Sequence, residues 1–318
     1  MNILVTLPVQ STHKELLENA YPGAAFRYHT ASELTREDAA WAEVCIGNLP
    51  PKYLPDAVNL KWLQLNSAGA DAYLGNLPSG TLLTNATGAY GLAISEHLLA
   101  MLLGIQKKLH LYRVNQIHHN WHDEGNVTSI EGARALVVGA GNIGGDFARK
   151  LHALGAEVYG IRRTAKVRDP WLTELYHMDK LDELLPEMDI VALCLPGTPE
   201  TKGLFDAERL AKMKRGAILL NVGRGTAIDS DALCDALTSG HLGGAGLDVT
   251  EPEPLPVSHP LWDAPNCIIT PHVSGFYHLP ETFERIVRIA ADNLTRYREG
   301  RTLVNLVDER TGYRTLRE

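Results

Sequence analysis

The stretch 134–164, RALVVGAGNIGGDFARKLHALGAEVYGIRRT, constrains the fold of this chain more than any other part. Residues 135–138 are apolar without alternation, which is typical of a parallel strand covered on both faces. Gly139, Gly141 and Gly144 follow with the spacing G-x-G-x-x-G, and a helical pattern comes directly after them. A second apolar run at 157–161 lies at the distance that a strand–helix–strand unit needs. The stretch therefore predicts a parallel α/β sheet.

This unit also predicts a binding site for a dinucleotide. The first glycine permits a sharp turn, the second lets the backbone approach a pyrophosphate, and the third allows the helix to pack closely on the strand. The free amides at the start of the helix would point at the pyrophosphate. We expect cofactor contacts from Gly139, Gly141, Asn142, Ile143 and Gly144.

The second strand ends on Arg162 and Arg163, where the adenosine ribose of a dinucleotide should lie. Folds that prefer NAD place an acidic residue there to bind the ribose 2′-hydroxyl. A guanidinium suits a 2′-phosphate instead, and one such contact of about 1.5 to 3 kcal/mol favours NADPH over NADH roughly ten- to a hundredfold. Thr164 could add a hydroxyl to this site. The alternative is that these arginines, with Lys166 and Arg168, form a solvated basic face.

Composition excludes several classes of protein. The chain has 318 residues, 45% hydrophobic and 21% charged, which is ordinary for a globular protein with room for two domains. Its net charge of −8 argues against broad attraction to nucleic acid or an anionic membrane. The four cysteines show no C-x-x-C spacing, and no run of 18 apolar residues occurs, so we expect a cytoplasmic protein. His118, His119 and His122 have no carboxylate or cysteine at a ligand spacing, and no metal is expected.

Short apolar runs predict two parallel sheets. The first comprises residues 3–7, 25–28, 44–47, 62–65 and 82–84, and the second adds 190–195, 217–222, 244–249 and 267–270 to the glycine-rich unit. Asp229 is placed to cap a helix over 229–237, and an amphipathic helix is expected over 281–297. A helix over 94–110 has too many apolar positions for one exposed face, and we expect it to be buried between domains or between subunits.

Small residues at 66–71, NSAGAD, follow the end of a predicted strand. Ligands of open α/β sheets bind at the carboxyl ends of strands. Successive backbone amides at Ser67, Ala68 and Gly69 could hold a carboxylate. An unliganded tight turn explains the same residues if this piece is considered alone.

Three other stretches past strand ends each supply one ionisable group. Arg224 lies in NVGRG, Glu253 in DVTEPEP and His272 in TPHVSG. Reduction of a 2-oxo acid requires a hydride, a proton for the carbonyl oxygen and a cation that holds the carboxylate and polarises the ketone. A histidine gains and loses a proton near neutrality, and a hydrogen-bonded glutamate would fix its tautomer. Taken singly, each residue also fits a surface turn, a solvated loop or a histidine bonded to backbone.

Together, the stretches LPGTPETKGLF, MKRGAILLNVGRG, GAGLDVTEPEPLP and HPLWDAPNCIITPHVSG and the glycine spacing resemble the D-isomer-specific 2-hydroxyacid dehydrogenase family, in order and spacing, over about residues 82–285. The resemblance implies that Arg224, Glu253 and His272 form the catalytic set. It implies that Asp248 contacts the nicotinamide carboxamide and that residues 67–69 bind the substrate carboxylate. It also assigns five residues to the cofactor pocket: Leu195, Pro196, Thr201, Val222 and Gly223.

The resemblance further implies two doubly wound parallel-sheet domains, with a Rossmann nucleotide-binding domain over 98–284 inserted into a flavodoxin-like substrate domain made of 1–97 and 285–318. It implies a homodimer formed through the long helix after Ile94. Because Arg162 stands where NAD-preferring members place an acid, the chain is most similar to the NADPH-preferring glyoxylate and hydroxypyruvate reductases, which act on small 2-oxo acids.

Two further features of the sequence bear on the function that the resemblance implies. Formate dehydrogenases share the fold but lack the glutamate partner of the histidine, so Glu253 argues against that reaction. The segment after His272 departs from the family's P-H-x-x-G-T pattern, and Tyr277 and His278 are candidates to line the substrate cleft instead. The competing function is a cofactor-sensing, corepressor-like interaction protein on the same fold with little turnover.

Overall fold

A computed structural model describes residues 1–163 and 168–308 and divides the chain into two compact units. Unit 2 comprises Gly91–Phe276, and unit 1 takes Met1–Tyr90 together with the chain from Tyr277 onward. This division falls seven and eight residues before the sequence-based boundaries at 97/98 and 284/285. They differ because the helix that begins at Gly91 belongs wholly to unit 2, while Tyr277 hydrogen-bonds to Asn66 in unit 1.

Unit 1 contains a five-stranded parallel sheet in the order β2-β1-β3-β4-β5, which is the flavodoxin-like order. Its strands are short and mostly buried because helices cover a parallel sheet on both faces. They match the predicted runs within one to two residues: β1 (Asn2–Val5), β2 (Ala25–Tyr28), β3 (Val44–Ile46), β4 (Trp62–Gln64) and β5 (Leu82–Thr84).

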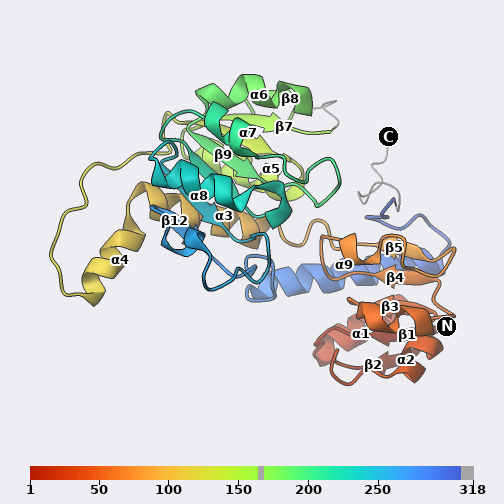
Figure 1. The fold of residues 1–318 in the computed structure, drawn as a ribbon. Helices are drawn as coiled ribbons and strands as arrows, with labels where there is room; N and C mark the ends of the chain where they lie inside the picture. The colour runs from red at the N-terminus through yellow and green to blue at the C-terminus, as the bar shows by residue number, and fades with distance from the viewer. Residues whose placement is uncertain (164–167, 309–318) are drawn as a thin grey trace. The chain divides into compact units, whose positions relative to one another are not determined.

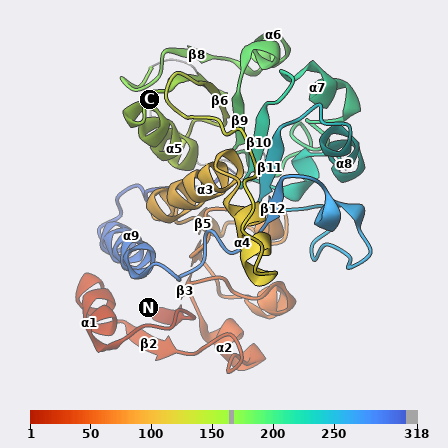
Figure 2. The same cartoon turned by 90° about the vertical axis from the view of Figure 1, so that its left-hand side faces the viewer.

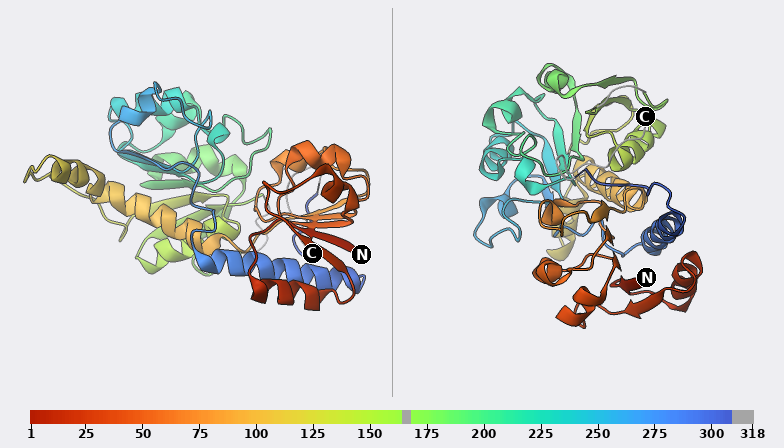
Figure 3. Two further views of the ribbon diagram at one scale, coloured as in Figure 1. Left: turned by 90° about the horizontal axis from the view of Figure 1, so that it is seen from below. Right: turned by 90° about the vertical axis from the view of Figure 1, so that its right-hand side faces the viewer.

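The helices of unit 1 come from both ends of the chain. They are α1 (Ser11–Ala20), α2 (Arg36–Trp41) and α9 (Pro280–Arg298), and α1 and α9 lie side by side (Figure 3). Buried polar groups fasten α9 to the sheet, because Asn293 donates to Gln64 of β4 over 2.8 Å and to the carbonyl of Val304 over 3.0 Å. The C-terminal helix is therefore part of the core of unit 1.

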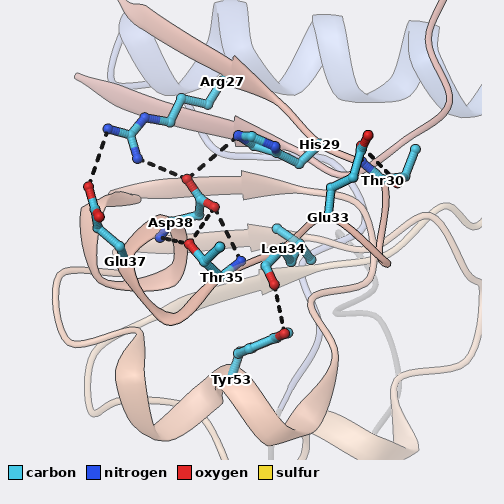
Figure 4. Close-up of polar contacts among 9 residues, drawn as sticks. All are labelled: Arg27, His29, Thr30, Glu33, Leu34, Thr35, Glu37, Asp38 and Tyr53. Carbon is cyan, nitrogen blue, oxygen red and sulfur yellow. Dashed lines mark hydrogen bonds and ion pairs between the residues drawn. The ribbon is translucent and has the colours of Figure 1, made fainter.

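The turn between β2 and α2 is built around the buried carboxylate of Asp38 (Figure 4). Thr35 caps α2, and its hydroxyl donates to Asp38 over 2.7 Å. Arg27 donates to the other carboxylate oxygen over 2.8 Å. Burial opposes ionisation, but the hydrogen bonds from Thr35 and Arg27 outweigh it and hold the pKa of Asp38 below its usual value.

Unit 2 contains a seven-stranded parallel sheet in the order β12-β11-β10-β9-β6-β7-β8 (Figure 2). This is the doubly wound order, with the reversal between β6 and β9, where ligands of such sheets bind. The strands are β6 (Arg134–Val138), β7 (Glu157–Ile161), β8 (Glu174–Tyr176), β9 (Ile190–Leu193), β10 (Ile218–Asn221), β11 (Gly244–Leu247) and β12 (Cys267–Ile269). The two predicted sheets and the α/β class are thereby confirmed, whereas the short edge strand β8 was not predicted.

Helices cover both faces of this sheet, with α3 and α5 on one side and α7 and α8 on the other (Figure 2). Their bounds are α3 (Gly91–Gln106), α5 (Asn142–Ala153), α6 (Leu181–Leu184), α7 (Ala207–Lys212) and α8 (Ser230–Thr238). The predicted cap of α8 is confirmed, because the Asp229 carboxylate accepts hydrogen bonds from two amides of the first turn.

The single continuous helix predicted over 94–110 is wrong. Helix α3 ends at Gln106, and a second helix, α4 (Leu109–Ile117), follows. Lys108 lies between them with a φ of +56°, which does not fit a continuous helix. In addition, Leu98, Met101 and Leu102 of α3 are buried where the helix packs on α5 and on the sheet of its own unit. These three side chains are therefore covered within unit 2, and burial of the helix between subunits stays a prediction.

By contrast, α4 and the loop that follows it extend away from the rest of unit 2 (Figure 1). We call residues 109–129 the arm. Large apolar side chains on the arm are exposed: Leu109, Val114, Ile117, Trp121 and Val127. Across residues 1–163 and 168–308, the structure contains no helix that is both long and apolar enough to cross a lipid bilayer.

Candidate active site

The glycine-rich turn has the geometry that a dinucleotide requires. Gly139 has a φ of +91°, and a Cβ on it would lie 2.6 Å from the carbonyl oxygen of Cys194. A Cβ on Gly144 would overlap the carbonyl oxygen of Gly139, so this glycine permits the helix to pack against the turn. A Cβ on Gly141 would contact only the Gly139 carbonyl, at 4.0 Å. The backbone at Gly141 thus remains open to a ligand.

The start of α5 provides donors for a pyrophosphate. Gly141 is its N-cap, and within the described chain no side chain caps this end and no acidic residue lies in its first turn. The first amides of a helix have no partner within the helix, and they carry its partial positive charge. The amides at Asn142, Ile143 and Gly144 therefore fit the diphosphate of a dinucleotide.

The residues expected at the adenosine ribose lie at the end of β7. Arg162 donates to the carbonyl of Ala140, within the glycine-rich turn, and forms an ion pair with Asp169. Its guanidinium is therefore held beside the phosphate-binding turn. Arg163 is exposed next to it, while Thr164 lies outside the described residues.

The loops that follow β10, β11 and β12 carry the three ionisable candidates, and these strands are neighbours in the sheet. Half-buried Arg224 follows β10 and donates to the carbonyl of Gly223 over 2.8 Å. The side chain of Asn221 braces this loop by donating to the Arg224 carbonyl over 2.9 Å. A Cβ on Gly225 would overlap the backbone of Thr250, so the Arg224 loop touches the loop that carries Glu253.

Glu253 and His272 form a hydrogen-bonded pair. The Nδ1 atom of His272 lies 2.9 Å from the Oε2 atom of Glu253, and the other carboxylate oxygen accepts from the Thr250 amide over 3.1 Å. The side chains of His272 and Glu253 are 52% and 39% exposed. Because the carboxylate only accepts, Nδ1 carries the proton, and Nε2 is left to exchange a proton with a bound substrate.

Asp248 lies at the end of β11 and is only 1% exposed. Its Oδ1 atom accepts from the Thr270 hydroxyl over 2.6 Å and from the Val273 amide over 2.9 Å. Its Oδ2 atom accepts from the Ser274 amide over 3.1 Å and from the Ser274 hydroxyl over 2.5 Å. The carboxylate that was expected to contact the nicotinamide carboxamide therefore already binds the loop that carries His272, and the contact to the cofactor stays a prediction.

The residues expected to line the cofactor pocket follow β9 and β10. Leu195 and Val222 are each 8% exposed, and Gly223 packs against the backbone of Leu195. The Thr201 hydroxyl donates to the carbonyl of Pro196 over 2.8 Å and closes its own turn. These residues shape the carboxyl end of the sheet beside the glycine-rich turn, since β9 pairs with β6.

The predicted carboxylate-binding turn lies in unit 1. The carbonyls of Ser67, Ala68 and Gly69 accept hydrogen bonds from within unit 1, whereas their amides have no hydrogen-bond partner among residues 1–163 and 168–308. Asn66, directly before them, donates to the Tyr277 hydroxyl. Burial raises the pKa of Tyr277 to about 12, so this hydroxyl keeps its proton at neutral pH. Tyr277 therefore lies beside the turn.

Sequence reasoning missed His97 and Thr270. The Nε2 atom of His97, on α3, lies 2.9 Å from the Thr270 hydroxyl, which in turn donates to Asp248. A signal was available, because a histidine in a largely buried apolar helix needs a polar partner. The partner itself lies 173 residues further along the chain and has no local signature.

Comparison with known proteins places this geometry in a family. The sequence model described as "D-isomer specific 2-hydroxyacid dehydrogenase, NAD binding domain" matches residues 99–274. The chain belongs to the D-isomer-specific 2-hydroxyacid dehydrogenase family. The predicted family is thereby confirmed, and with it an oxidoreductase that has a domain for binding a nicotinamide dinucleotide.

Individual relatives agree with this membership. The chain is 36% identical to a hydroxypyruvate reductase of Blautia hydrogenotrophica over 231 residues, which cover 69% of each protein. A D-isomer-specific 2-hydroxyacid dehydrogenase of Xanthobacter autotrophicus, solved with NADPH and MES, matches with a TM-score of 0.82 and 32% identity over 98% of this chain and 99% of that one. The NADPH-dependent glyoxylate/hydroxypyruvate reductase of Sinorhizobium meliloti, solved with NADP and sulfate, gives 0.82 and 27% over the same shares.

Proposed function

We propose that this dehydrogenase uses NADPH to reduce a small 2-oxo acid of the glyoxylate or hydroxypyruvate kind to the D-2-hydroxy acid. The observation that carries the proposal is the exposed His272–Glu253 pair, 2.9 Å apart, on loops that neighbour the loop of Arg224. The Blautia and Sinorhizobium proteins, named for these reactions, support the substrate class.

Each residue has one task in this reaction. Arg224 binds the substrate carboxylate and polarises the ketone, because its guanidinium is a fixed cation. Glu253 accepts the Nδ1 proton of His272, and the imidazolium form of His272 donates its second proton, from Nε2, to the carbonyl oxygen, which leaves a neutral imidazole with its proton on Nδ1. Bound NADPH supplies the hydride that completes the reduction. The assignment of the amides of residues 67–69 to the substrate carboxylate stays a prediction from the family resemblance.

The preference for NADPH rests on Arg162 and Arg163. A 2′-phosphate accepts charge-assisted hydrogen bonds from a guanidinium, which a ribose hydroxyl cannot match. The Ala140 carbonyl and Asp169 already hold Arg162 beside the glycine-rich turn. The Xanthobacter and Sinorhizobium structures, solved with NADPH and NADP, support this assignment. NADH is expected to bind more weakly.

The direct test is the loss of reduced-nicotinamide absorbance when purified protein is mixed with NADPH and a panel of 2-oxo acids. We expect turnover with glyoxylate or hydroxypyruvate and the D-isomer as product. Cofactor binding without turnover of any acid in the panel would overturn the proposal and favour the cofactor-sensing alternative.

A second test concerns the cofactor alone. Arg162→Asp should lower the ratio of kcat/KM for NADPH to that for NADH roughly ten- to a hundredfold, because a carboxylate repels the 2′-phosphate. Asp169→Asn is the matched control: it frees Arg162 from its ion pair and should lower the KM for NADPH about two- to fivefold without changing that for NADH. An unchanged ratio in Arg162→Asp would mean that the 2′-phosphate binds elsewhere.

We propose that the protein is a cytoplasmic homodimer and that the arm, residues 109–129, forms its interface. On the arm Ile117 is 58% exposed and Trp121 fully so, and exposed groups of large apolar side chains mark association sites. The arm begins with the last two residues of the long helix, 94–110, through which the dimer was expected. Ile117→Ser with Trp121→Ser should yield a monomer in analytical ultracentrifugation, whereas a wild-type monomer would refute the dimer.

The proposed cytoplasmic location is supported by the four cysteines, all of which are free, as expected in a reducing compartment.

A further inference from the structure

The loop that carries His272 is held by one buried carboxylate. The two oxygens of Asp248 accept four hydrogen bonds, all from Thr270, Val273 and Ser274, which flank the histidine on both sides. The His272 amide itself donates to the backbone carbonyl of Asp248 over 2.8 Å. A carboxylate offers about four acceptor positions, so that of Asp248 is fully used.

His272 needs this support because its backbone is strained. Its φ is +51°, in the left-handed region that residues with a Cβ seldom occupy. Such conformations persist only where the surroundings fix them. Here they turn the next two amides, of Val273 and Ser274, toward the same carboxylate. The position of the imidazole therefore depends on the Asp248 carboxylate.

The hydrogen bonds around Thr270 fix the direction of each donor. The Thr270 hydroxyl has one proton, and at 2.6 Å from a buried carboxylate it donates that proton to Asp248. The contact of 2.9 Å between His97 Nε2 and the same hydroxyl must then have His97 as the donor. His97 stands on α3, which is packed against the sheet, so it orients the hydroxyl from a fixed support. Its Nε2 atom is 3.7 Å from Asp248 Oδ1, beyond hydrogen-bond distance, so the hydrogen-bonded route to the carboxylate runs through Thr270.

We propose that His97 is a positioning residue for the reaction, acting through Thr270 and Asp248 to keep the His272 imidazole against Glu253. This inference rests on the proposed function for its kinetic consequence. Its structural consequence, the state of the His272–Glu253 pair in the resting protein, does not depend on the substrate.

Two matched pairs of variants test it. Thr270→Val removes the hydroxyl with little change in shape, and Thr270→Ser restores it. His97→Phe removes the donor, and His97→Gln places an amide near the position of Nε2. We expect kcat to fall about tenfold in Thr270→Val and about three- to tenfold in His97→Phe, because small misplacements of a catalytic group slow the reaction steeply. The KM for NADPH should stay within about twofold, and the Ser and Gln variants should recover most of kcat.

A double variant distinguishes a chain of contacts from two separate effects. If His97 acts through Thr270, the double variant His97→Phe with Thr270→Val should be no slower than Thr270→Val alone. Effects that multiply would overturn the proposed chain. Equal kcat in Thr270→Val and Thr270→Ser would overturn it as well.

A substrate-free measurement separates this inference from the proposed function. The proton on Nδ1 of His272, identified by its loss in His272→Gln, should give a downfield NMR signal that weakens in Thr270→Val and His97→Phe and returns in the conservative variants. An unaltered signal in both would refute the inference, even in an active enzyme. An altered signal in a protein that turns over no 2-oxo acid would uphold the positioning role while refuting the proposed reaction. If Thr270→Val fails to fold, the variants His97→Phe and His97→Gln test the inference by the same NMR signal.

Discussion

Asp38 in unit 1 and Asp248 in unit 2 are both almost inaccessible to solvent, 5% and 1% exposed, and both have hydrogen bonds to each carboxylate oxygen. They differ in what those bonds hold. Asp38 closes the turn before α2, and its partners Arg27 and Thr35 lie within eleven residues of it (Figure 4). Asp248 holds a loop 22 to 26 residues away that presents a half-exposed histidine.

The comparison teaches that burial and hydrogen bonding of a carboxylate do not by themselves mark a functional site. A carboxylate that closes its own turn contributes to the free energy of folding. One that fixes a strained, exposed loop contributes to the precision of that loop. Changes at Asp38 should therefore lower stability and leave turnover unchanged. Changes in the loop that Asp248 holds should lower turnover and leave stability unchanged.

The largest expected effect is on turnover at the loop that Asp248 holds. His272→Gln should lower kcat about 10²- to 10⁴-fold, because it removes the proton donor. Its thermal midpoint should stay at the wild-type value, since the side chain is half exposed. Steady-state kinetics and calorimetry on the same sample check both parts. A stable variant with wild-type kcat would remove His272 from the reaction.

The next effect is on stability in unit 1. Asp38→Ala should destabilise unit 1 by about 2 to 3 kcal/mol, because it removes charge-assisted hydrogen bonds from a buried position. Faster hydrogen exchange of the β1 and β2 amides and a lower urea midpoint would report it. The kcat of the variant should equal that of the wild type. A loss of kcat larger than the loss of folded protein would contradict the division of roles.

The contribution of Asp38 should depend on pH in a defined direction. Its pKa in the folded protein lies below that of an unfolded aspartate, about 3.9, so its stabilisation is fully present above that value. It is lost as the pH falls through the folded pKa. The difference in unfolding free energy between wild type and Asp38→Asn should thus be constant near neutrality and shrink below about pH 4. A difference that grows toward acid would mean that the pKa is raised instead.

Sequence reasoning predicted the sheets of both units because parallel strands are continuous apolar runs. It also predicted where the candidate residues lie, because the loops at the carboxyl ends of such strands bind ligands. It failed where no local pattern exists. Lys108, which separates α3 from α4, has a left-handed backbone that a lysine does not indicate in the sequence. The edge strand β8 was missed because it is short and only partly buried. The partners of Asp248 follow from strand pairing and packing, which spacing alone does not specify.

The smallest expected effect separates the cap from the charge at Asp38. Thr35→Ala should destabilise α2 by about 1 kcal/mol, because Thr35 is the N-cap and its hydroxyl also donates to Asp38. Thr35→Ser keeps both bonds and should restore the loss. Glu37→Gln should cause no measurable change, since that carboxylate is exposed and 4.0 Å from Arg27. Urea midpoints of the three variants rank them. If Glu37→Gln loses as much unfolding free energy as Thr35→Ala, the charges around Arg27 stabilise the turn more than the geometry of the cap does. The effect of Asp38 would then also come from its charge beside Arg27.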